Sequence, residues 1–226
     1  AGSALASYPL FFGESHFNIK DPILASFFGL ALITFYWGIT KSRWKFIFAS
    51  SVITGLAMGV KFNIVFLPFI VVPWLLLHLL QTRKLPSRPI LLSLLAYPFV
   101  TVLIFYALWP FLWPDPIYNF LTTLKFYKSI GTGTPHELKD YIVKGWNTYA
   151  PLWILYTTPI PVLALASVGL IGSAWDFVFK RKIIFVILAL WLFVPILRVS
   201  YPGTSIYGGV RQIMEYIPAL CTLAGV

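Results

Sequence analysis

Cysteine and charge are both scarce in this chain of 226 residues. Cys221 is its one cysteine, which excludes an intrachain disulfide and a zinc or iron–sulfur site built from several cysteines. Charged residues make up 11% of the chain, against roughly 25% in soluble proteins, and 59% of the residues are hydrophobic. The mean hydropathy of +0.83 leaves too little polar side chain to cover a globule in water. The composition therefore predicts an integral membrane protein.

Acidic residues are scarcer than basic ones, with 7 Asp and Glu against 17 Lys and Arg, which gives a net charge of +10. Such a surplus is typical of proteins that bind nucleic acid, but the placement of the basic residues does not fit that class. Nine of them form three short runs, each between long apolar stretches, as in the cytoplasmic loops of membrane proteins. We therefore expect the lipid bilayer, and no nucleic acid, as a partner. The runs are Lys41, Arg43 and Lys45; Arg83, Lys84 and Arg88; and Lys180, Arg181 and Lys182.

The apolar stretches predict an all-α fold, a polytopic transmembrane helix bundle with about six complete spans. A partial span is expected at each end, because residues 1–12 and 213–226 are apolar but shorter than the ~20 residues that a crossing needs. In this interpretation residues 1–226 form a single transmembrane domain that is a fragment of a longer chain. The complete spans are expected at residues 22–40, 46–60, 62–80, 90–112, 151–173 and 183–197.

The alternation of these spans places all three basic runs on one side of the membrane, which the positive-inside rule identifies as the cytoplasm. Six of the seven acidic residues fall on or near the opposite side. Residues 113–150 form a long loop on that extracytoplasmic side. Within the loop, Phe120, Leu124 and Tyr127 have the spacing of an amphipathic helix lying on the membrane. We therefore expect any chemistry at the extracytoplasmic face.

Five polar side chains gather just before the first complete span. The segment Gly-Glu-Ser-His-Phe-Asn-Ile-Lys-Asp-Pro places two carboxylates, an imidazole, an amide and an ammonium at a helix entrance. One interpretation is that Asp21 caps the helix that follows and that Lys20 extends toward the lipid headgroups. Capping leaves Glu14, His16 and Asn18 unexplained. Because ionisable groups at a membrane border are costly, the group favours a functional site.

A second polar group follows a pair of glycines. In the segment Gly-Leu-Ala-Met-Gly-Val-Lys-Phe-Asn, the spacing of Gly55 and Gly59 predicts that another helix approaches closely. Lys61 and Asn63 come next, at the outer end of an unusually short span, where the ammonium can pair with a lipid phosphate. Snorkelling of Lys61 to the membrane surface explains the same spacing equally well.

A third polar group precedes the last apolar segment. The stretch Tyr-Pro-Gly-Thr-Ser at residues 201–205 is typical of a turn, which places Arg211 at the outer mouth of a helix. Its guanidinium offers a planar fork for bidentate binding of phosphate. The alternative is that Arg211 and Tyr207 anchor the chain at the membrane–water interface.

Four segments, in this order, resemble bacterial membrane glycosyltransferases of family 39, the protein O-mannosyltransferase-like group. In the last of them the family usually has Tyr-Asp-Gly-x-Arg-His, so Gly208 and Gln212 replace an Asp and a His. The resemblance implies the GT-C fold, a polyprenyl-phosphate-linked sugar as donor, and an acceptor protein, lipid or glycan. It also implies an active site on the extracytoplasmic side of the plasma (inner) membrane. The segments are residues 16–22, 55–63, 108–116 and 207–212.

The resemblance further implies roles for the polar residues. Asp21, with His16 beside it, resembles a catalytic carboxylate of an outer loop, and the main base is expected N-terminal to this sequence. Asp21 and Glu14 are candidate ligands for a divalent metal ion. Two carboxylates are too few to identify which metal it is. A departing lipid phosphate needs cationic groups, for which Lys61 and Arg211 are the candidates. The expected substrate-binding residues are Asn18, Lys20, Lys61, Asn63, Tyr207 and Arg211.

A transporter or flippase of a lipid-linked or anionic substrate is the alternative function, since it would also use basic groups and polar helix ends. Transporters usually place ionisable residues near the bilayer midplane and have repeated halves with broken helices. The interiors of the expected spans are almost free of charge, and the polar pattern before the first span has no second copy. The sequence therefore favours an interfacial enzyme over a transporter, and a non-catalytic scaffold is disfavoured because the polar residues gather on one face.

Overall fold

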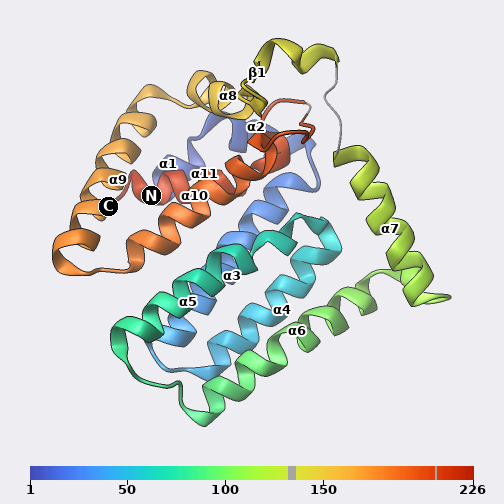
Figure 1. Cartoon of the computed structure of the whole chain (residues 1–226), viewed down its shortest axis with the longest axis vertical. Helices are drawn as coiled ribbons and strands as arrows, with labels where there is room; N and C mark the ends of the chain where they lie inside the picture. Colours follow the sequence, from blue (N-terminus) through green and yellow to red (C-terminus); the bar gives the residue numbers. More distant parts are fainter. Residues whose placement is uncertain (132–135, 207) are drawn as a thin grey trace.

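The computed structural model describes residues 1–131, 136–206 and 208–226, and over these residues the chain is almost entirely helical (Figure 1). A short strand β1 (Ile142–Val143) pairs antiparallel with β2 (Trp146–Asn147). The predicted all-α fold is thus confirmed for the described residues. The α-helices are α1 (Gly2–Ala6), α2 (Pro9–Phe17), α3 (Asp21–Thr40), α4 (Trp44–Val60), α5 (Pro68–Thr82), α6 (Arg88–Leu108), α7 (Pro116–Gly131), α8 (Tyr149–Thr157), α9 (Ile160–Lys180), α10 (Ile184–Ser200) and α11 (Tyr216–Leu223). The 3-10 helices are η1 (Phe62–Phe66), η2 (Pro110–Leu112), η3 (His136–Tyr141) and η4 (Arg211–Ile213).

Four helical segments in the described part of the chain are long and apolar enough to cross a membrane: α3, η1 together with α5, α6 and α9. Two further apolar helices, α4 and α10, have 17 residues each. These six segments overlap the six expected spans, and four of them reach full spanning length. Their length and composition support an integral membrane protein.

The expected single span at residues 151–173 is wrong, because the chain there forms two helices, α8 and α9. Between them Thr158 has an extended backbone, with φ −82° and ψ 128°. A proline disfavours the helical conformation of the residue before it, and Pro159 follows directly. The helix therefore ends at Thr157, and a new helix begins at Ile160.

The partial span expected at residues 1–12 is also interrupted. Tyr8 has an extended backbone before Pro9, and it separates α1 from α2. The two breaks meet in space. The buried hydroxyl of Tyr8 hydrogen-bonds with Thr158 Oγ1 at 2.6 Å and lies 3.3 Å from the hydroxyl of Tyr216. Three segments that are far apart in the sequence are thus joined where two helices are interrupted.

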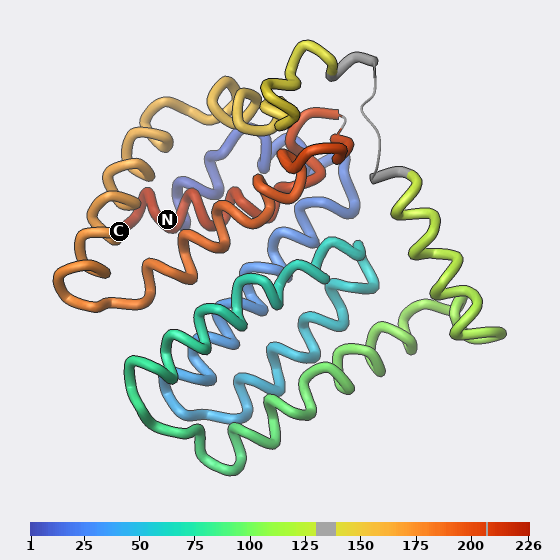
Figure 2. Tube along the Cα trace, viewed as in Figure 1, coloured from blue at the N-terminus to red at the C-terminus, as the bar shows by residue number. Residues whose placement is uncertain are grey.

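The three turns that carry the basic runs lie toward one side of the molecule, away from α2 (Figures 1 and 2). They join α3 to α4, α5 to α6, and α9 to α10. Gln81 Nε2 donates a hydrogen bond to the carbonyl oxygen of Arg181 at 2.5 Å, which connects the second and third turns directly. This shared side is the one predicted from the alternation of the spans.

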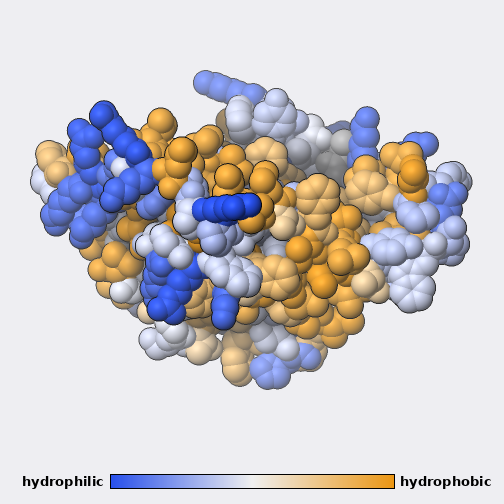
Figure 3. All heavy atoms as spheres, turned by 90° about the horizontal axis from the view of Figure 1, so that it is seen from below, coloured by the Kyte–Doolittle hydropathy of each residue, from blue (hydrophilic) through white to orange (hydrophobic). Residues whose placement is uncertain are grey.

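Large apolar side chains cover the outer faces of the long helices. On α6, Phe99 is 77% exposed, and on α9, Ile171 is 69% exposed. Hydrophobic side chains form broad areas between the hydrophilic patches of the face in Figure 3. Soluble monomers rarely expose contiguous apolar areas of this kind, whereas a lipid-facing surface requires them.

Glycines set the distance between packed helices. A Cβ atom at Gly55 of α4 would lie 2.6 Å from Ile104 Cβ and 2.8 Å from the Thr101 carbonyl oxygen of α6. The close helix approach predicted from Gly55 and Gly59 is therefore confirmed. Gly169 of α9 packs in the same way against the backbone of α11, where a Cβ would overlap the carbonyl oxygen of Leu223.

We expect Gly169→Ala to destabilise the protein by about 1–3 kcal/mol, because the added methyl group has no space against the α11 backbone. Gly172→Ala is the matched control, since Gly172 lies on the same helix and has no neighbouring atom within 4 Å of an added Cβ. Thermal unfolding of the detergent-solubilised protein measures both. Equal melting temperatures for the two variants would contradict the close packing of α9 on α11.

Candidate functional site

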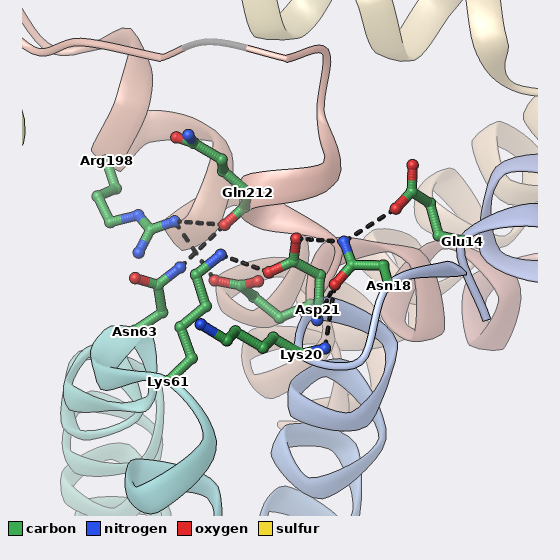
Figure 4. A network of polar contacts seen from close by, with 9 residues as sticks. Glu14, Asn18, Lys20, Asp21, Lys61, Asn63, Arg198 and Gln212 are labelled. Carbon is green, nitrogen blue, oxygen red and sulfur yellow. Dashed lines mark hydrogen bonds and ion pairs between the residues drawn. The ribbon is translucent and has the colours of Figure 1, made fainter. Parts of the chain in front are cut away.

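Charged side chains from four parts of the chain meet at one end of the helices (Figure 4). Asp21 is the first residue of α3, Lys61 directly follows α4, and Arg198 lies near the end of α10. Glu215 stands between η4 and α11. The chain therefore brings its charges together where apolar helices end, as their cost at membrane depth requires.

Asp21 and Lys61 form the central ion pair. Asp21 Oδ1 lies 2.5 Å from Lys61 Nζ, and the two side chains are 11% and 20% exposed. The position of Asp21 in the first turn of α3 also favours a negative charge there. Both carboxylate oxygens of Asp21 are used by side chains of the network, so capping does not account for this residue. The ammonium group of Lys61 is likewise paired within the protein, so snorkelling does not account for Lys61.

Asn18 connects a second carboxylate to the pair. Its Nδ2 donates hydrogen bonds to Glu14 Oε2 at 2.9 Å and to Asp21 Oδ2 at 2.7 Å. Its Oδ1 accepts hydrogen bonds from the backbone N–H groups of Lys20 and Asp21, both at 3.0 Å. Because both ends of the amide are occupied, its orientation is fixed, and Glu14 is held beside Asp21.

The same contacts bear on the predicted metal ion. The amide N–H group of Asn18 occupies the space between Glu14 and Asp21, where a cation bridging both carboxylates would lie. The described residues bring together no group of three or more His, Cys, Asp and Glu side chains that could hold a metal. Mg²⁺ is often held by only one or two carboxylates, together with water and substrate phosphate. The metal ion at Asp21 and Glu14 therefore stays a prediction.

A second, more deeply buried pair lies beside the first. Arg198 Nη2 lies 3.4 Å from Glu215 Oε1 and donates a hydrogen bond to the carbonyl oxygen of Gln212 at 3.1 Å. Asn63 Nδ2 donates to the same carbonyl oxygen at 2.9 Å. Glu215 is only 2% exposed, and this burial raises the pKa of its carboxyl group, which the positive charges of Arg198 and Lys61 partly oppose.

One member of each pair, Lys61 and Arg198, lines a groove of about 770 Å³ between the region of η1 and α5 and the end of α10. The polar lining includes Lys61, Asn63, Arg198 and Gln212 of the network and further polar groups within residues 201–205. Apolar side chains line the rest and include Phe66, Phe69, Val194 and Leu197. Phe69 and Leu197 are more than half exposed, so the apolar part opens toward the outer surface of the bundle. The groove has the chemistry of a site for an amphiphile with an anionic head.

His16 lies apart from this network, and Lys20 joins it only through its backbone. His16 Nδ1 is hydrogen-bonded to the carbonyl oxygen of Phe12 at 2.8 Å, and the His16 ring lines a separate hollow of about 390 Å³ between α2 and α3. Lys20 contributes its backbone N–H group to Asn18, while its side chain is exposed.

Arg211, from the third expected polar group, does not join the network either. Arg211 is exposed, and its side chain folds over Gly208, where an added Cβ would lie 2.8 Å from Arg211 Nε. Gly208 and Gly209 both have positive φ angles, which form a tight turn before η4. Tyr207 lies outside the described residues. Of the predicted site residues, the structure thus brings together Glu14, Asp21 and Lys61, and the arginine beside them is Arg198 rather than Arg211.

Arg198 and Glu215 were not predicted as site residues. The sequence contains a signal for each, because both are ionisable residues at the border of an apolar stretch. A lone arginine after an apolar span also fits snorkelling, and only the folded chain brings it beside Glu215.

Comparisons of the chain with protein-family models, with curated proteins and with solved structures found no match. The geometry of the network and of the groove therefore carries the functional argument.

Proposed function

We propose that the protein is a membrane glycosyltransferase that moves a sugar from a polyprenyl-phosphate donor to the hydroxyl group of an acceptor. The observation that carries this proposal is the groove, which joins cationic side chains at one part to apolar walls at the other. A polyprenyl-phosphate sugar has the matching form, with a charged phosphate between a polar sugar and an apolar chain. The apolar walls bind the chain, and Lys61 and Arg198 lie at the phosphate.

The chemistry of such a transfer matches the charges of the network. The bond between the anomeric carbon and the phosphate oxygen breaks, and its electron pair stays on the phosphate. The acceptor oxygen forms the new bond to the anomeric carbon, and its proton passes to a carboxylate. Lys61 stabilises the charge on the departing phosphate, because preorganised cations act most strongly where charge develops. Asp21 orients Lys61 and, with Glu14, provides the carboxylates of the site.

The position of the charges favours an enzyme over a transporter or flippase. Asp21 begins α3, Lys61 follows α4, and Arg198 lies in the last turn of α10. Transporters concentrate such groups near the middle of the membrane. A network at the helix ends is suited to an acceptor that approaches from water. We place this end at the extracytoplasmic face of the plasma (inner) membrane, since the basic turns lie away from it.

We expect Asp21→Asn to lower sugar transfer by at least about a hundredfold, because the amide neither fixes the Lys61 ammonium nor accepts a proton. Asp115→Asn is the matched control, since Asp115 is exposed and lies before α7. The assay incubates membrane-embedded protein with a panel of radiolabelled polyprenyl-phosphate sugars, with and without a chelator. Wild-type transfer by Asp21→Asn would remove this residue from the site. Movement of the lipid across the bilayer without transfer would favour the flippase.

We expect Lys61→Gln to lower the rate of transfer by about 100-fold to 1000-fold, the usual effect of removing one group that stabilises a developing oxyanion. Lys125→Gln on α7 is the control, because Lys125 is an exposed lysine outside the network. Single-turnover rates with saturating donor separate this effect from weaker binding. A slower rate in both variants would indicate a general effect of surface charge.

A further inference from the structure

The guanidinium group of Arg198 is incompletely paired. Its Nη2 donates to the carbonyl oxygen of Gln212, and its contact with Glu215 is long, at 3.4 Å. The Nε–H group of Arg198 is buried and has no hydrogen-bond partner among the described residues. A buried donor without a partner is unusual in folded proteins and calls for an explanation. A ligand group bound in the groove beside Arg198 would provide that partner.

The surroundings of Arg198 indicate what kind of ligand this is. The Cζ atom of Arg198 lies 4.8 Å from the ring centre of Phe66, and both residues line the groove. Stacking on an aromatic ring holds the guanidinium plane in place, so its N–H groups form a preorganised fork. A fork of this kind matches two oxygens of one phosphate group.

The charge of the site also favours an anion at Arg198. Lys61 is closely paired with Asp21, at 2.5 Å, whereas the partner of Arg198 is 0.9 Å more distant, at 3.4 Å. The positive charge of Arg198 is therefore the less compensated of the two.

We propose that Arg198 is the residue that selects an anionic over a neutral amphiphile, by binding the phosphate group of a lipid in the groove. This proposal rests on the proposed function for the nature of the lipid and assigns the recognition of its phosphate to a residue of α10. Arg211, the candidate from the sequence, folds over Gly208 and does not line the groove. Glu215 lies 3.4 Å from the guanidinium and so leaves part of it available to a ligand.

Direct binding to the full chain in detergent tests the proposal. The probes are polyprenyl phosphate, the uncharged polyprenol and inorganic phosphate, and native mass spectrometry or a radiolabelled lipid measures their affinity. Because Arg198→Gln alone would leave Glu215 buried without its partner, the principal variant is the double change Arg198→Gln with Glu215→Gln. Glu215→Gln alone shows whether loss of the acid disturbs the groove. Arg211→Gln tests the rival arginine, and Arg43→Gln, in a basic turn, is the matched control.

We expect the double variant to bind polyprenyl phosphate at least about tenfold more weakly, as the loss of a charge-assisted bidentate contact predicts. Polyprenol should bind equally to the double variant and to the wild type, and Glu215→Gln alone should retain polyprenyl phosphate. Inorganic phosphate that competes fully with the lipid would indicate a site for the free ion, and would overturn the assignment to a lipid. Unchanged affinity in the double variant, or a loss in Arg211→Gln alone, would overturn the role of Arg198.

These measurements need no sugar transfer. If polyprenyl phosphate binds through Arg198 while no donor in the panel is used, the proposed transferase activity fails and the inference about Arg198 stands. If transfer occurs and Arg198 does not affect binding of the phosphate, the inference fails and the activity stands.

Discussion

The ion pair between Asp21 and Lys61 is the interaction on which the arrangement of the site depends. It joins the start of α3 to the residue after α4, two helices that pack side by side along their length. Both side chains are mostly buried, so removal of either partner would leave a charge with little access to water. Asn18 joins Asp21 to Glu14 on one side of the pair, and Lys61 lines the groove on the other side. The pair thus links the end of α2 to one wall of the groove.

The second pair extends this order to the C-terminal half of the chain. Arg198 and Asn63 both donate to the carbonyl oxygen of Gln212, so α10, η1 and η4 share one acceptor. Such contacts give the groove two walls from opposite halves of the sequence. The acids and the cations of the site are interleaved, which limits the electrostatic cost of holding them at the border of an apolar bundle.

Much of the fold and part of the site could be predicted from the sequence. Apolar stretches and basic turns predicted the helices and their alternation, and the polar segment before α3 predicted a site that contains Glu14, Asn18 and Asp21. The breaks at Tyr8 and Thr158 were missed, because hydropathy records burial or lipid contact and is insensitive to a proline that ends a helix. Arg211 was misplaced, because the turn at Gly208 decides its direction and that turn depends on tertiary context.

The contact of Tyr8 with Thr158 and Tyr216 limits how α2 can move. Tyr8 is fully buried and directly precedes Pro9, so α2 starts from a fixed point and extends to Asn18 at its far end. A displacement of α2 from the bundle would break a buried hydroxyl hydrogen bond at one end and the contacts of Asn18 at the other. Any molecule that reaches the carboxylates must therefore pass α2 in this position. Access to this site is set by the size and shape of the molecule that enters, with no requirement for a helix to swing aside.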